Sequence, residues 1–200
     1  MTDQLKSSIV SSVATRDASG FSFFRRLWFM GKPLPIKQEV VRIWKTGSCQ
    51  FTRVSVNEHP LIDGAVFSVK GVLEHHDSPN LHHWVDKQNF YTSAEALARY
   101  QNESFASRPR FFGTRLEKRM WFKKIFSSVP FRFQFLFLFN WCRVRPWQTG
   151  YEGQAWARLR VWVWRMRENK IKEMRTTGRK IELPKVTLGQ PHPGAVQVDS

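Results

Sequence analysis

The sequence has few cysteines, no long apolar run and no recognisable secretory leader. Cys49 and Cys142 lie far apart and lack the paired spacing of a metal site or a disulfide framework. We therefore expect a cytoplasmic chain with reduced thiols. The longest uncharged run in the basic segment 108–180 is 133–142, with 10 residues, whereas a membrane-crossing helix needs about 20. No segment is predicted to cross a bilayer.

Acidic residues are scarce, with 16 Asp and Glu against 32 Lys and Arg and a net charge of +16. The excess is concentrated in the second half, because residues 108–180 contain 19 basic and only 4 acidic side chains. Six of the nine tryptophans fall in the same segment. This imbalance predicts an anionic partner such as a phosphorylated ligand, a nucleic acid or an acidic lipid surface.

The common motifs of phosphate, metal and nucleic-acid binding are also missing. The chain has no G-x-G-x-x-G loop, no P-loop lysine pattern, no zinc finger, no homeodomain and no RNA-recognition motif. Four histidines lie close together, at His75, His76, His82 and His83. Adjacent residues point to different faces of an element, so we predict no metal site there.

Hydrophobic patterns predict a short helix at the start of the chain, then a strand-rich segment, then helices. The predicted strands begin at residue 21 and include 40–44, 51–56 and 65–74, with a break at 31–35 and turns at 45–48 and 63–64. The predicted helices follow a cap at Asp77 and also span 114–126 and 152–175. Phenylalanine at every second position of 131–140 is typical of a strand.

The helix predicted at 152–175 carries an apolar arc. The arc covers roughly 120° when successive residues are placed 100° apart around the helix axis. The arc is formed by Ala155, Trp156, Leu159, Trp162, Val163 and Met166. Arginines flank it on both sides, at Arg158, Arg160, Arg165 and Arg167. We predict that Trp156, Trp162 and these four arginines contact an anionic membrane surface. The alternative is that the arc packs on the protein core, as most amphipathic helices do.

Residues 18–176 carry a series of short motifs in order: an aromatic, Arg-rich strand, a Gly turn, an Arg strand, a Glu motif, an Asp-Gly turn, and a His before a helix. The matching residues are Arg42-Ile43-Trp44, Val56-Asn57-Glu58, Leu61-Ile62-Asp63-Gly64, His75, Trp84, Asn89 and Tyr91. With these motifs the chain resembles the second half of bacterial family 2 glycosyltransferases. These are GT-A-fold enzymes that build lipopolysaccharide core, capsule or exopolysaccharide.

The resemblance implies roles for individual residues. Glu58, at the Glu motif, is the expected catalytic base that takes the proton from the acceptor hydroxyl. Arg42, His59 and Asp63 are the expected substrate-binding residues, although Arg42 also fits a purely structural strand arginine. The implied substrates are a nucleotide sugar and a lipid-linked or lipopolysaccharide acceptor, and the implied cofactor is a divalent metal, Mg²⁺ or Mn²⁺.

The sequence contains no D-x-D motif, so the ligands of that metal are not expected in this chain. The chain thus resembles a C-terminal portion of such an enzyme, and a separate N-terminal half is an expected partner. The predicted fold class is α/β. It comprises a partial GT-A domain (residues 1–76), a helical, basic, membrane-apposed region (77–180) and a flexible tail (181–200). In relatives the segment that matches 131–140 is helical, so we predict a helix there.

Two other functions stay open. A small basic nucleic-acid-binding protein would explain the net charge but not the ordered motifs between residues 42 and 91. A non-catalytic membrane-surface module is the third interpretation. We favour the glycosyltransferase, located in the cytoplasm and peripheral to the inner membrane, and predict no nucleic-acid partner.

Overall fold

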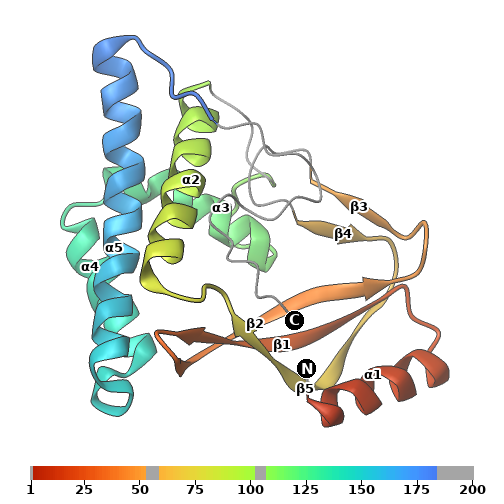
Figure 1. Cartoon of the computed structure of the whole chain (residues 1–200). Helices are drawn as coiled ribbons and strands as arrows, with labels where there is room; N and C mark the ends of the chain where they lie inside the picture. The colour runs from red at the N-terminus through yellow and green to blue at the C-terminus, as the bar shows by residue number, and fades with distance from the viewer. Residues whose placement is uncertain (1, 53–58, 102–106, 184–200) are drawn as a thin grey trace.

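A computed structural model describes residues 2–52, 59–101 and 107–183, which form a mixed α/β fold (Figure 1). The strands are β1 (Gly20–Phe29), β2 (Lys32–Trp44), β3 (Cys49–Phe51), β4 (Pro60–Ile62) and β5 (Val66–His76). The helices are α1 (Asp3–Thr15), α2 (Leu81–Tyr100), α3 (Arg115–Ile125), α4 (Arg132–Val144) and α5 (Pro146–Thr177), with a short 3₁₀ turn, η1 (Phe126–Ser128), after α3.

The larger sheet has the order β2-β1-β5, with β1 antiparallel to β2 and parallel to β5. The prediction of a break at 31–35 is wrong, because β2 already begins at Lys32. Met30 and Gly31 both have positive φ and close a tight hairpin, which is the geometry that two-residue hairpin turns require. Pro33 and Pro35 are tolerated because β2 lies at the edge of the described sheet.

Helix α1, which the pattern of the first residues predicts, covers part of this sheet. Leu5 is fully buried and packs in a core cluster with Phe21 and Phe23 of β1 and Val69 of β5. Gly71 of β5 has φ +122°, and a Cβ atom there would lie 3.1 Å from Leu5. Glycine therefore permits both the backbone conformation and the close approach of α1.

A second core cluster joins the sheet to the helices. Phe29 of β1 and Leu34 of β2 pack with Trp84 of α2, Val144 of α4 and Trp156 of α5. The rings of Trp84 and Trp156 meet edge to face, with centroids 6.0 Å apart. Figure 1 shows α2, α4 and α5 grouped at one end of the sheet, while α1 lies at the other. The strand-rich and helical segments are thus packed against each other.

The predicted helices are present, with differences at their ends. Helix α2 is capped by Asn80, whose side chain accepts a hydrogen bond from the His83 backbone N–H at 2.8 Å, and not by Asp77 as predicted. Helix α3 matches its predicted range and begins with a capping box formed by Thr114 and Glu117. The helix predicted for the phenylalanine-rich run is confirmed as α4.

Helix α5 lies along α2, and Lys170 is one of the residues that join them. Lys170 Nζ donates to Asn89 Oδ1 at 2.7 Å, to Ser93 Oγ at 2.7 Å and to Thr92 Oγ1 at 2.9 Å. Helix α4 is joined to α5 by an ion pair between Arg132 and Glu168 at 2.8 Å. None of the helices in the described ranges combines the length and apolar character that a bilayer-spanning helix requires.

Candidate functional site

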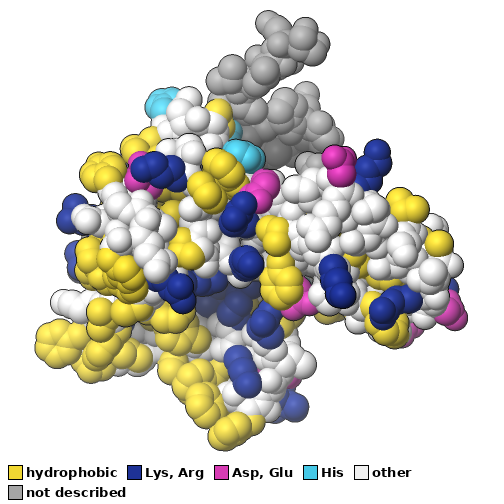
Figure 2. Space-filling view, turned by 90° about the horizontal axis from the view of Figure 1, so that it is seen from below, with side chains coloured by type: hydrophobic (Ala, Val, Ile, Leu, Met, Phe, Trp, Pro, Cys, Tyr) yellow, Lys and Arg dark blue, Asp and Glu magenta, His cyan; other side chains and the backbone are white. Residues whose placement is uncertain are grey.

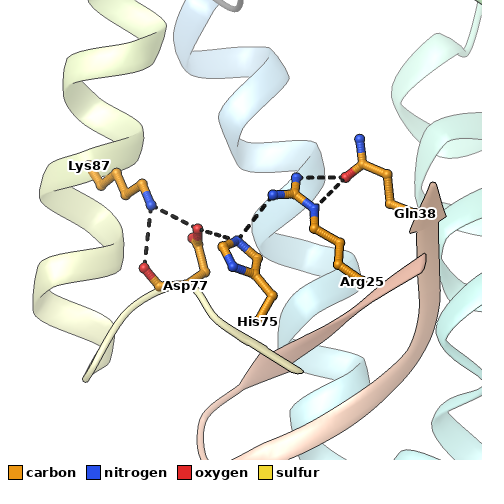
Figure 3. Close-up of polar contacts among 5 residues, drawn as sticks. All are labelled: Arg25, Gln38, His75, Asp77 and Lys87. Carbon is orange, nitrogen blue, oxygen red and sulfur yellow. Dashed lines mark hydrogen bonds and ion pairs between the residues drawn. The ribbon is translucent and has the colours of Figure 1, made fainter. Parts of the chain in front are cut away.

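Polar and charged side chains converge where the sheet meets α2 and α5. Strand β5 ends at His76 and α2 begins at Leu81, so residues 77–80 pass from the sheet to the helices. We call the group in Figure 3 the basic junction. It consists of Arg25 of β1, Gln38 of β2, His75 of β5, Asp77 of the connection and Lys87 of α2.

Asp77 is the centre of charge pairing in the basic junction. Its Oδ1 accepts hydrogen bonds from Lys87 Nζ at 2.7 Å and His75 Nε2 at 3.2 Å (Figure 3). Burial alone would raise the pKa of Asp77, but the bonds from His75 and Lys87 outweigh it and hold the pKa well below the usual range for a carboxyl. Asp77 is therefore ionised at neutral pH.

The Asp77 contact fixes how His75 and Arg25 are arranged. Because Nε2 of His75 donates to Asp77, that nitrogen carries a proton and cannot accept a hydrogen bond from Arg25 Nη1, 3.5 Å away. Arg25 is oriented instead by Gln38, whose Oε1 accepts from Nη2 at 2.7 Å and from Nε at 3.2 Å. The guanidinium is thus held by a neutral side chain and forms no ion pair within the described residues, although the charge of Asp77 acts on it.

Two further arginines act on this group through their charge. Burial and the neighbouring Arg42 of β2 both lower the pKa of Arg25. Burial lowers the pKa of Arg160 of α5, and Glu95 and Asp77 act in the opposite direction. Within the described ranges neither Arg42 nor Arg160 forms an ion pair, and Arg160 lies 5.8 Å over the ring of Trp156. Arginine stays charged in proteins, so the junction has an excess of positive charge.

The structure does not assemble the predicted substrate-binding residues into one group. Arg42 is exposed on β2 and lies near Arg25. Asp63 is exposed at a bend, where its backbone N–H donates to Ser48 O at 2.9 Å. No hydrogen bond or ion pair in the described part of the chain joins Arg42, His59 and Asp63. The predicted base, Glu58, lies outside the described residues.

His59 lies beside α3 and not beside the basic junction. Its backbone N–H donates to the Thr52 hydroxyl at 2.9 Å, and its carbonyl accepts from the Thr52 N–H at 3.0 Å. Burial, followed by the charges of Arg119 and Lys123, lowers the pKa of His59. Its imidazole is therefore neutral at neutral pH.

The six residues predicted to contact a membrane do not share one surface. Trp156 is 9% exposed and Arg167 only 5% exposed, because α5 turns this side toward α2 and the sheet. Most of the apolar arc packs against the core cluster that contains Trp156, as the alternative interpretation stated. Arg160 and Trp162 are partly buried, and Arg158 and Arg165 are exposed. The interior positions of Trp156 and Arg167 correct their assignment to a surface.

Three of the four clustered histidines make separate contacts. His75 binds Asp77, His82 lies 3.2 Å from Asp86 one turn later in α2, and His76 stacks on Trp28. In the three described ranges no group of three or more His, Cys, Asp or Glu side chains is placed to hold a metal ion. The residues present there do not fit the divalent cation that the resemblance implies.

Sequence reasoning missed Arg25 and Lys87 and assigned Asp77 to a helix cap. Lys87 lies ten residues after Asp77, and Arg25 lies on a different strand. No spacing rule connects three such positions. The one usable signal is the position of Asp77 itself, directly after a predicted strand, where side chains of neighbouring strands converge.

We expect Asp77→Asn to lower the free energy of unfolding at pH 7 by about 2 kcal/mol, because it removes two charge-assisted hydrogen bonds. A carboxyl whose pKa is lowered on folding contributes stability above its unfolded pKa, near 3.9, and loses that contribution as the pH falls. Urea unfolding across pH 7 to pH 3 measures this, and the difference from the parent protein should shrink toward pH 3. A constant difference, or one matched by exposed Asp63→Asn, would contradict the assignment.

Comparison with known proteins identifies no relative: no family model matches the chain, and no curated protein or solved structure is significantly similar to it.

Proposed function

We propose that the basic junction binds the phosphate groups of a substrate, and that the chain carries the acceptor side of a glycosyltransferase. The observation that supports phosphate binding is the unpaired positive charge of Arg25, Arg42 and Arg160 around one carboxylate. That carboxylate, Asp77, already accepts from His75 and Lys87. An added anion would therefore meet three arginines that form no ion pair in the described part of the chain.

Arginine suits this task because its planar guanidinium donates two parallel hydrogen bonds to a phosphate. Gln38 fixes Arg25 through two hydrogen bonds, so the guanidinium is oriented before a ligand arrives. Preorganised cations favour the charge that develops on a departing diphosphate. The junction thus offers the electrostatic part of a group-transfer site.

Glycosyl transfer is the reaction that the ordered motifs around Arg42, Glu58 and Asp63 suggest. In it, the acceptor oxygen bonds to the anomeric carbon as the bond from that carbon to the nucleoside diphosphate breaks. The acceptor hydroxyl loses its proton to a base, for which we propose Glu58. Arg25 and Arg160 would stabilise the diphosphate that leaves. We assign no step to a metal ion.

We expect uridine diphosphate to bind the chain and Arg160→Gln or Arg25→Gln to weaken that binding about 10- to 100-fold, the equivalent of one lost charge-assisted contact. Arg179→Gln is the matched control, because it removes the same charge from an exposed position after α5. Isothermal titration calorimetry measures the affinities, and thermal unfolding checks that each variant is folded.

Equal losses in all three variants would show a non-specific charge effect and contradict the assigned site. Tight binding of single-stranded nucleic acid without measurable binding of the diphosphate would favour the nucleic-acid alternative. Transfer of a labelled sugar from a nucleotide sugar to a lipid-linked glycan, lost in Glu58→Gln, would support the reaction itself.

A further inference from the structure

Helix α4 is apolar on two sides, and only one of them is covered. Leu136 and Val144 are buried, and Phe133 and Phe137 line a groove of about 430 Å³ between α4 and α5. On the other side, large apolar side chains face outward. They cover an arc of about 100° when successive residues are placed 100° apart around the helix axis. Their exposed fractions are 72% for Phe131, 61% for Phe135, 56% for Leu138 and 60% for Phe139.

The same surface continues onto the start of α5. A single residue, Arg145, separates α4 from α5, so the first turn of α5 follows directly on the last turn of α4. Trp147 and Tyr151 of α5 are 66% and 68% exposed. We call these six residues of α4, its N-cap and α5 the aromatic face: Phe131, Phe135, Leu138, Phe139, Trp147 and Tyr151. Surface patches of this kind on a single chain mark interaction sites.

The charges around the aromatic face have one sign. Residues 118–151 contain seven Lys or Arg and no Asp or Glu. Arg143 and Arg145 are exposed beside the face, and Arg158 and Arg165 are exposed along the groove. None of these four arginines forms an ion pair within the described residues. On the side where α4 and α5 lie, at the left of both views, Figure 2 shows hydrophobic side chains at the surface with Lys and Arg among them.

We propose that the aromatic face docks onto an anionic phospholipid surface, with α4 lying in the plane of the membrane interface. Phenylalanine and leucine would enter the boundary between headgroups and acyl chains, and Trp147 and Tyr151 would sit at headgroup level. The four unpaired arginines would meet lipid phosphates. A second copy of the chain is a poorer occupant, because pairing two such faces would bring arginines together without carboxylates. This proposal is independent of ligand binding at the basic junction.

Vesicle flotation tests the proposal with the full chain. We expect binding to vesicles of phosphatidylcholine mixed with phosphatidylglycerol, weaker binding to phosphatidylcholine alone, and a loss of the difference at high salt. Phe135→Ser with Phe139→Ser should lower vesicle partitioning at least about tenfold, since both rings are removed from the proposed contact. Arg143→Gln and Arg158→Gln should each lower it about fivefold on anionic vesicles only.

Two controls make the outcome decisive. Phe112→Ser removes a ring that is 92% exposed but lies before α3, outside the aromatic face, and should leave partitioning unchanged. Circular dichroism verifies that each variant is folded. Absence of binding to anionic vesicles, or equal binding by the parent and the double Phe variant, would overturn the proposal. Concentration-dependent self-association that the double variant abolishes would identify a second copy as the occupant instead.

Discussion

Replacing Glu95 by Gln is expected to lower the free energy of unfolding by about 3–5 kcal/mol, the usual cost of removing one partner from a buried ion pair. Glu95 of α2 binds Arg167 of α5 at 3.0 Å and Lys123 of α3 at 3.5 Å. Burial would raise the pKa of Glu95, but these two cations outweigh it and lower the pKa. The carboxylate therefore holds three helices together as an anion.

The size of the effect follows from what Gln would leave behind. Arg167 is almost fully buried, and its Nε and Nη2 already lack hydrogen-bond partners within the described residues. A guanidinium cannot lose its charge to relieve the burial. Lys123 can, since burial already lowers its pKa. Most of the cost should therefore come from Arg167, which keeps its charge without a carboxylate partner from Glu95 and still stacks over Trp164, with 4.2 Å between Cζ and the ring centroid.

A double-mutant cycle separates this electrostatic cost from a general packing defect. In the double variant Glu95→Gln with Arg167→Met, no uncompensated guanidinium remains, so it should be more stable than Glu95→Gln alone. Exposed Glu182→Gln is the matched control and should change stability by less than about 0.5 kcal/mol. Urea unfolding followed by circular dichroism gives the values for the parent, Glu95→Gln, Arg167→Met, the double variant and the control. A double variant less stable than Glu95→Gln would contradict the assigned role of the pair.

Helices and strands could be predicted from the sequence where a local hydrophobic pattern is sufficient. The environment of a side chain could not be predicted where it depends on residues far away in sequence. The apolar arc of α5 follows from helical periodicity, and so does its position in the chain. What covers the arc does not, because Trp84 and Leu34, which pack with Trp156, lie far away in sequence. An apolar stripe that contacts a membrane and one that packs against a core have the same helical periodicity. Trp156 was therefore assigned to the wrong environment.

The phenylalanine-rich run shows why period 2 was misleading. In α4, Phe133 and Phe137 point toward α5 while Phe131, Phe135 and Phe139 point outward. A helix that is apolar on two opposite sides places phenylalanine at every second position without forming a strand. Large exposed apolar side chains are thus found on α4, whereas the apolar arc of α5 is mostly packed against the core.

The basic junction could not be predicted for a different reason. Its ion pairs join Asp77 to Lys87 of α2, and Arg25 reaches the group only because β1 pairs in parallel with β5. That pairing is a property of sheet order, which the residues of a single strand do not specify. Arg42 was identified from a motif, and its charge acts on Arg25 although the register of β1 and β2 pairs Arg25 with Gln38.

Trp84→Ala is expected to cost about 3–5 kcal/mol of the free energy of unfolding, the range for removing a large aromatic side chain from a core. Trp84 is 1% exposed and packs edge to face against Phe29 and Trp156, with centroids 5.9 and 6.0 Å away. These contacts join the sheet to α2 and α5, so the cavity would open at the interface of the two segments. With total stabilities of about 5–15 kcal/mol, the variant should be marginally folded.

Trp84→Phe tests the same contact without the risk of unfolding. The indole Nε1 of Trp84 is buried and has no hydrogen-bond partner within the described ranges, so phenylalanine removes an unsatisfied donor together with part of the ring. Because these effects oppose each other, we expect a cost of about 1 kcal/mol, well below that of alanine. Trp147→Ala, at an exposed position, is the control and should be near neutral. Equal losses in Trp84→Ala and Trp147→Ala would show that the Trp84 cluster does not hold the sheet and helices together.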